Sequence, residues 1–211
     1  EGPIRLEIQD HVFALNIYLG TNMSEVLSAF SAATGRPRHV SRWSYGPWID
    51  GFGGPDEILR VAALARQNDI PASALWAEDW LGTQLALGGE HLTYNWQEDE
   101  AYYPDLEGVA NALHAQGIRF LTYFNPMIPN DTELYQEGLR GGYLVKNAYD
   151  GVIDLDFPFG APPAYFDISA PGAKEWYWSY LNKAVDKGVD GWMSDYGESL
   201  PYDALMGDGR H

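Results

Sequence analysis

From residue 40 onward the chain repeats one order of elements: a short apolar segment, a loop, and a segment with helical periodicity. The apolar segments predict strands over residues 43–48, 72–77, 119–124 and 189–194. The segments with helical periodicity begin at Pro55, near Leu106, after Asp131 and at Pro171. Strands that alternate with helices run parallel, because each helix returns the chain to the same end of the sheet. We therefore expect an α/β fold made of four β/α units.

The first 37 residues follow a different pattern. Alternating apolar residues predict two strands, over residues 4–8 and 12–19, and helical spacing predicts a helix over residues 24–34 that ends at Gly35. Arg36 and Pro37 form a linker to the β/α units. Within those units, residues 142–170 are rich in Asp, Pro and aromatic side chains, and we expect an insertion or a long loop there.

Charge and composition exclude several classes of function. Thirteen Lys and Arg against thirty Asp and Glu give a formal net charge of −17, which repels nucleic acids and anionic membranes. No stretch approaches the roughly 18 apolar residues of a membrane span, so we expect a soluble chain and leave its compartment open. The sequence has no Cys, and its five His residues form no metal-ligand pair. It also has no phosphate-binding loop, so we expect neither a metal nor another cofactor.

A carboxylate or an amide stands at the end of every predicted strand. These side chains are Asp50, the pair Glu78 and Asp79, Asn125, and Asp195. In a parallel α/β fold the carboxyl ends of the strands share one face, and in a (β/α)₈ barrel that face carries the chemistry. A single polar residue could simply begin a loop, but four in register beside Trp or Tyr predict a shared pocket.

The segment around Asp195 resembles a known motif. It runs Gly-Trp-Met-Ser-Asp-Tyr-Gly-Glu over residues 191–198, which resembles the nucleophile motif of glycoside hydrolase family 31. Residues 75–80, 123–126 and 166–171 also fall where that family would place similar segments. The resemblance implies a (β/α)₈ TIM barrel, of which only about the first four units are present. It implies that residues 1–37 are the end of an N-terminal β-domain with its connector, and that residues 38–211 are the first half of the catalytic barrel.

The resemblance also implies chemical roles. A family member is expected to be a retaining, exo-acting α-glycoside hydrolase with an α-linked glycoside as substrate. Asp195 is implied as the nucleophile, and Glu198, one turn further on, is expected to orient it, with a plain solvated Glu as the alternative. Asp79 matches the family's carboxylate that binds sugar hydroxyls. Glu78 should then point away from the pocket, because neighbouring side chains of a regular strand face opposite ways.

Further residues are expected to line the sugar pocket. Aromatic rings stack on the apolar faces of pyranose rings, so Trp48 and Trp80 are expected there. Asn125 ends the third strand, and Met193 stands where many family members have Trp. The last strand is most similar to the sulfoquinovosidase branch, which would bind a sulfonate through a Gln near the first strand and an Arg and a Trp in the following helix. Tyr45 occupies the Gln position instead.

The departures from that branch leave the substrate open. Residues 55–66 contain no Trp, and Arg60 is the one basic candidate there before Arg66, so a neutral α-glucoside is at least as well supported as a sulfoquinovoside. The family's general acid/base has no counterpart up to His211, so we expect the remainder of the barrel as a partner and little activity from this stretch alone. A transglycosylase with the same nucleophile and a non-catalytic carbohydrate-binding protein are the alternatives, and the intact carboxylates count against the second.

Overall fold

The computed structural model describes residues 2–8, 13–86, 89–157 and 160–209. The chain divides into two compact units, Glu1–Val40 and Ser41–His211, and each is described by itself. In the described part of the chain, no helix combines the length and the apolar character that crossing a bilayer requires.

The N-terminal unit contains the predicted helix. Helix α1 spans Met23–Thr34, and its N-cap is Asn22, whose side chain accepts a hydrogen bond from the backbone N–H of Glu25 at 3.1 Å. Gly35 follows the helix with a φ of +94°. The two predicted strands are wrong for residues 4–8 and 13–19, which contain no strand, while residue 12 and the predicted turn lie outside the described residues. An isolated pair of strands buries too little apolar surface to be stable, and the apolar side chains of these segments are largely exposed.

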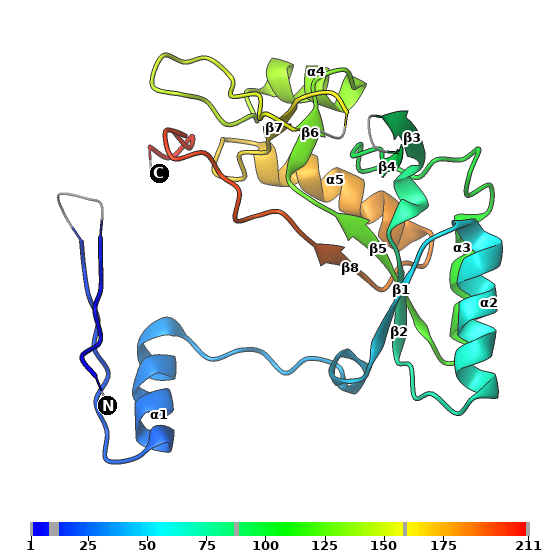
Figure 1. The fold of residues 1–211 in the computed structure, drawn as a ribbon, viewed down its shortest axis with the longest axis horizontal. Coiled ribbons are helices and arrows are strands. Elements are labelled where there is room, and N and C mark those ends of the chain that lie inside the picture. Colours follow the sequence, from blue (N-terminus) through cyan, green and yellow to red (C-terminus); the bar gives the residue numbers. More distant parts are fainter. Residues whose placement is uncertain (1, 9–12, 87–88, 158–159, 210–211) are drawn as a thin grey trace. The chain divides into compact units, whose positions relative to one another are not determined.

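The second unit is built on a four-stranded parallel sheet, as predicted. Its strands are β1 (Trp48–Gly51), β2 (Ala74–Ala77), β5 (Arg119–Phe124) and β8 (Gly191–Ser194). Their spatial order is β1-β2-β5-β8, and every neighbouring pair is parallel (Figure 1). Each strand therefore lies beside the next strand of the β/α series, which is the arrangement of consecutive strands in a TIM barrel.

Four helices accompany this sheet, and all four were predicted. They are α2 (Gly54–Gln67), α3 (Leu106–Ala115), α4 (Glu133–Gly141) and α5 (Ala173–Asp186). Helix α2 buries Ile58, Ala62 and Ala65, spaced so that they share one face, and they join a core that contains Leu75 and Phe120 of the sheet. The predicted cap of α4 is corrected: Thr132, not Asp131, caps it, by accepting from the backbone N–H of Tyr135 at 3.1 Å.

The first strand lies further along the chain than predicted. Residues Arg42–Tyr45 form a 3-10 helix, and β1 begins only after Pro47. Proline has no N–H to donate to a sheet, so it is found at the start of a strand rather than within one. The Pro47 carbonyl accepts from the backbone N–H of Ser73 at 2.9 Å, which starts the pairing of β1 with β2.

Two short antiparallel pairs follow the carboxyl ends of the sheet strands. After β2 and a 3-10 turn, β3 (Thr83–Ala86) pairs with β4 (Gly89–Leu92). After β5, β6 (Met127–Pro129) pairs with β7 (Pro163–Tyr165), which lies in the expected insertion. Both additions lie beyond the carboxyl ends of the strands that they follow, β2 and β5 (Figure 1).

Candidate active site

The two faces of the sheet have different environments. Because successive side chains of a strand point to opposite faces, Leu75 and Ala77 of β2 share one face, and both belong to the core that includes the helices. Trp76 points to the other face, where its ring stacks on that of Tyr123 with centroids 5.9 Å apart. Glu78 follows Trp76 on this second face, which is therefore the one that presents polar groups at the carboxyl edge.

Asp195 extends β8 at that edge. Its backbone N–H donates to the carbonyl of Phe124 at 3.2 Å, so the chain still follows the sheet at this residue. One carboxylate oxygen, Oδ2, accepts from the Tyr123 hydroxyl at 3.0 Å, and the other, Oδ1, accepts from the backbone N–H of Tyr196 at 3.0 Å. The side chain is exposed. An oriented, accessible carboxylate at the end of a barrel strand can attack an electrophilic carbon.

Glu78 and Asp50 interact electrostatically with other carboxyl groups at this edge. Burial raises the pKa of Glu78, and the negative charges of Asp50, Asp79 and Asp195 raise it further. Burial also raises the pKa of Asp50, and Asp79 adds to that effect. The neighbouring negative charges therefore disfavour the ionisation of Glu78 and of Asp50.

The structure places Asp79 away from the polar face. Asp79 is fully buried, and its carboxylate accepts from the backbone N–H of Gly53 at 2.7 Å, from that of Gly54 at 2.9 Å and from the Tyr103 hydroxyl. The two glycine donors belong to the loop and first turn that begin α2, a common position for an anion. The expectation that only one of Glu78 and Asp79 faces the pocket agrees with this geometry, but the one facing it is Glu78.

Three aromatic residues expected in the sugar pocket lie elsewhere. Trp80 is 2% exposed, and its Nε1 donates to the carbonyl of Tyr123 at 2.8 Å, so its ring is part of the core. Trp48 is the first residue of β1 and therefore lies at the opposite end of the strand from the carboxyl edge, stacked on Trp43. Tyr45 precedes β1 and is 79% exposed. Trp48 was expected at the carboxyl edge because the predicted first strand ended at residue 48, where the observed strand begins. Tyr45 was expected there from the alignment with the Gln of the sulfoquinovosidase branch.

The remaining expected residues do lie near Asp195. Asn125 and Glu198 line the same hollow as Asp195, and this hollow has a volume of about 370 Å³. The side chain of Asn125 is buried beside the Tyr123 hydroxyl. Met193 is two residues before Asp195 and points to the same face of β8, 37% exposed. No hydrogen bond joins Glu198 to Asp195 among the contacts of the described residues, so the orienting role of Glu198 stays a prediction.

A second hollow, of about 240 Å³, opens beside the first. Glu78 lies in its lining together with four aromatic rings, those of Phe52, Tyr94, Phe157 and Tyr196. Sequence reasoning missed Tyr94, Tyr123 and Tyr196 as site residues. Alternation in β5 could have found Tyr123, which shares a face with Asn125. Tyr196 has a φ of +61°, rare for a residue with a side chain, and its carbonyl accepts from the Tyr165 hydroxyl.

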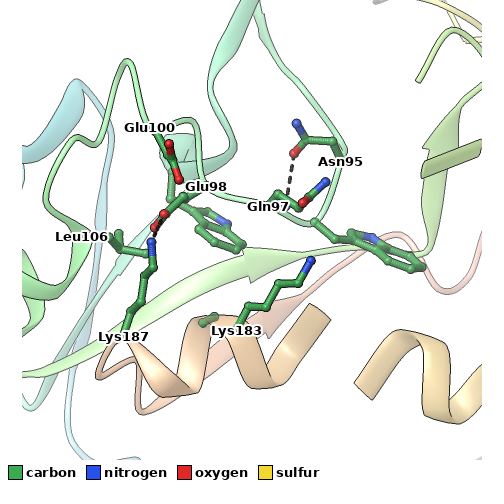
Figure 2. A pocket seen from close by; sticks show the side chains of 10 residues that line it. Asn95, Gln97, Glu98, Glu100, Leu106, Lys183 and Lys187 are labelled. Carbon is green, nitrogen blue, oxygen red and sulfur yellow. Dashed lines mark hydrogen bonds and ion pairs between the residues drawn. The ribbon is translucent and has the colours of Figure 1, made fainter. Parts of the chain in front are cut away.

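A larger hollow, of about 490 Å³, has a different lining (Figure 2). Lys183 of α5 and Lys187, the residue that follows this helix, reach into it, and Lys187 is paired with Glu98. Trp80 and Trp96 also line it, but both rings are buried and cannot stack on a ligand. None of the carboxylates at the strand ends belongs to its lining, so the edge with Asp195 is the better candidate for an active site.

Comparison with known proteins identifies the family of the chain. Residues 37–208 match the TIM-barrel domain of the glycosyl hydrolases family 31. The chain is 31% identical over 202 residues to a sulfoquinovosidase of Agrobacterium fabrum and 29% identical over 188 residues to one of Escherichia coli K12. These alignments cover 92% and 87% of this chain but only 30% and 27% of the relatives.

Solved structures give the same result. A family 31 sulfoquinovosidase from E. rectale, in complex with an aza-sugar inhibitor, superimposes with a TM-score of 0.76 at 31% identity. The match covers 88% of this chain and 28% of that enzyme. The described sheet of four consecutive parallel strands is thus the N-terminal part of the family's barrel. With the domain match, the parallel sheet and the strand-end carboxylates in agreement, this chain belongs to glycosyl hydrolase family 31.

Proposed function

We propose that this chain contributes the nucleophile to a retaining α-glycosidase, and that Asp195 is the nucleophile. The observation that carries the proposal is the position of Asp195: it ends a barrel strand, its carboxylate is exposed, and hydrogen bonds to both oxygens fix its orientation. Membership of family 31 and the similarity to sulfoquinovosidases support it.

The reaction takes place in two steps. A carboxylate oxygen of Asp195 forms a bond to the anomeric carbon while the bond from that carbon to the leaving oxygen breaks, and a general acid protonates the leaving oxygen. Water then attacks the same carbon, gives up a proton to the conjugate base, and releases Asp195 as the carboxylate. We assign the acid to no residue of this chain, and we propose the remaining part of the barrel as its source.

The groups around Asp195 can bind a sugar ring. We propose that Glu78 takes the hydroxyl-binding role that the resemblance gave to Asp79, because Glu78 faces the site and Asp79 is used by the backbone of the α2 loop. Asn125 and Met193 are proposed as further contacts of the first hollow. The aromatic rings of Tyr94 and Tyr196 are proposed to pack on apolar sugar faces.

The charge of the site favours a neutral α-glycoside as the substrate. Among the described residues that line the two hollows beside Asp195 are three further carboxylates, Glu78, Glu90 and Glu198, and the imidazole of His91, but no Lys or Arg. Arg60, the basic candidate of the first helix, is paired with Glu57 through two contacts of 2.7 and 2.6 Å. Sulfoquinovosides are the second candidate, because relatives at 29% and 31% identity carry that activity in their names. Rates with 4-nitrophenyl α-glucoside, α-xyloside and α-sulfoquinovoside would rank the candidates.

Trapping of the covalent intermediate tests the proposal. The full-length protein would be incubated with a 5-fluoro-α-glycosyl fluoride, digested and analysed by mass spectrometry. We expect a sugar adduct on the peptide that contains Asp195, and no adduct in Asp195→Asn, because fluoride leaves without help from an acid. An adduct on another carboxylate, or none on a protein whose circular dichroism is that of the folded state, would overturn the proposal.

Two alternatives give different products. A transglycosylase would form the same adduct but would transfer the sugar to an added acceptor in preference to water. A non-catalytic binding protein would retain a sugar ligand without turning it over and without forming an adduct.

A further inference from the structure

The hydroxyl of Tyr123 has a fixed position beside Asp195. Its ring is buried and stacks on Trp76 with an interplanar angle of 24°, and the ring of Tyr94 lies 6.3 Å from it, centroid to centroid. The backbone of Tyr123 is also held, because Trp80 donates to its carbonyl at 2.8 Å. A hydroxyl on such a constrained ring can move little relative to the sheet.

This hydroxyl donates to Asp195 Oδ2 at 3.0 Å, while the backbone N–H of Tyr196 donates to Oδ1. Two donors on different oxygens fix the plane of the carboxylate. The donor from Tyr123 comes from a neighbouring strand and therefore ties the direction of the carboxylate to the sheet itself. The donor from Tyr196 comes from the next residue in the loop and moves with Asp195.

The charged and titratable groups that face Asp195 come from several elements. Glu78 reaches it from the end of β2, Tyr94 from the segment before α3, and Tyr165 from β7. Glu78 is the charged one of these, and the charge of Asp195 helps to raise its pKa. Glu198, from the loop after Asp195, lines the same hollow as Asp195. The Asn125 side chain interacts with the Tyr123 hydroxyl and belongs to the same network.

We infer that Tyr123 is a positioning residue for the nucleophile: its hydroxyl donates to the Asp195 carboxylate and orients it next to Glu78. The inference rests on the proposed role of Asp195. Tyr123 does not itself exchange a proton or a bond with the substrate, since burial raises the pKa of its hydroxyl and the neighbouring Tyr94 and Asp195 raise it further.

The test is the pH dependence of kcat/KM in the full-length protein, measured with the 4-nitrophenyl α-glycoside that it hydrolyses fastest. The acidic limb of this profile reports ionisation of the nucleophile in the free enzyme. In Tyr123→Phe we expect this limb to move up by about one pH unit and the maximal kcat/KM to fall about tenfold, as for the loss of a hydrogen bond to a charged group.

Tyr135→Phe is the matched control. The Tyr135 hydroxyl also donates to a carboxylate oxygen at 3.0 Å, that of Asp154, but this pair is outside both hollows beside Asp195. Its profile should coincide with that of the wild type. If the profile of Tyr123→Phe also coincides with the wild type while Asp195→Asn is inactive, the positioning role is wrong and the proposed function stands.

Retained activity in Asp195→Asn, or a folded wild type that hydrolyses none of the three glycosides, would instead overturn the proposed function and the positioning role with it. If Tyr123→Phe does not fold, a protein with 3-fluorotyrosine at position 123 tests the inference instead. This residue keeps the aromatic ring and its hydroxyl donates a stronger hydrogen bond, so the acidic limb of the kcat/KM profile should move to lower pH. An unmoved limb would contradict the inference.

Discussion

Asp79 has hydrogen-bond donors around it and no contact with solvent. Replacing it with Ala leaves the N–H groups of Gly53 and Gly54 and the Tyr103 hydroxyl without their acceptor in a buried place. We expect Asp79→Ala to lower the free energy of unfolding by about 3 kcal/mol. Urea unfolding, followed by circular dichroism, measures this change.

Asp105 provides the control for that experiment. It caps α3 from an exposed position by accepting from the backbone N–H of Gly108 at 2.8 Å, so Asp105→Ala should cost only about 1 kcal/mol. If Asp79→Ala kept the wild-type stability and lost only affinity for sugars, the structural role of Asp79 would be wrong. The sugar-binding role expected from the sequence would then be the correct one.

The pair Glu78 and Asp79 also marks a limit of sequence reasoning at the scale of residues. Alternation predicted that one of the two faces the site, and it does. Which one depends on the face of β2 that the helices cover, and the strand itself, Ala-Leu-Trp-Ala over residues 74–77, is apolar on both faces. Packing alone determines which face the helices cover. Leu75 and Ala77 are buried core residues on one face, and Trp76 stacks on Tyr123 on the other.

Glu78 should make stability depend on pH. Burial and neighbouring carboxylates raise its pKa above the ordinary 4.5, so the folded state binds this proton more tightly than the unfolded state does. Ionised Glu78 therefore costs stability above its folded pKa, and that cost disappears below about 4.5, where both states are protonated. We expect Glu78→Gln to melt at a higher temperature than the wild type at pH 7 to 8, with the difference vanishing toward pH 4.

Melting temperatures of both proteins across this pH range check the expectation. Glu107→Gln removes the same charge from the exposed start of α3 and should show no comparable pH-dependent gain. A wild type that is more stable than Glu78→Gln at pH 8 would mean that Glu78 has a favourable partner when ionised.

At the scale of elements, the contact of β1 with α2 depends on a missing side chain. A Cβ at Gly51 would lie 2.2 Å from Cδ1 of Ile58 and 3.0 Å from Leu75, both of which are buried. We expect Gly51→Ala to destabilise the fold by about 2 kcal/mol, through overpacking. Ile58→Val removes the clashing Cδ1 and by itself should cost about 1 kcal/mol.

A double-mutant cycle tests this contact. Because valine lacks the clashing atom, the double variant should lose less stability than the sum of the two single variants, by about 1 kcal/mol in urea unfolding. Strict additivity would mean that α2 and β1 move apart freely, and that Gly51 is not needed for their packing.

The sequence predicted best those helices and strands that are long enough to show a clear pattern of apolar residues. Strand β5 has the predicted bounds of 119–124, and α3 buries the predicted face. Strand β1 is displaced because pairing with β2 begins at Pro47. The proline within residues 43–48 was the sequence signal against a strand there, and the prediction did not use it. The pair β6 and β7 was missed since each strand has three residues, and Met127 pairs with Tyr165 far along the chain. Such strands exist only through their pairing.

At the scale of the whole molecule, the fold class was predictable because the alternation of strand and helix leaves few topologies for a parallel sheet. The barrel itself was predicted from the resemblance rather than from periodicity. Four consecutive parallel strands are compatible both with a barrel and with an open sheet, and within the described residues β1 and β8 each pair with a single sheet neighbour. The match of residues 37–208 to the family's barrel domain decides between them.

The net charge of −17 is summed over all 211 residues and should control how the stability of this chain responds to salt. Like charges repel one another in the compact state, and the carboxylates at the sheet edge concentrate that repulsion around Glu78. Raising NaCl from 0.01 to 0.1 M shortens the screening length from about 30 to about 10 Å. We therefore expect the melting temperature at pH 7.5 to rise over this range, and to rise less in Glu78→Gln, which has lost one of the repelling charges.

A melting temperature that falls with salt would mean that attractive pairs such as Lys187 with Glu98 outweigh the repulsion. Repulsion among the carboxylates at the sheet edge would then not limit stability. The higher melting temperature predicted for Glu78→Gln at pH 7 to 8 should be absent as well.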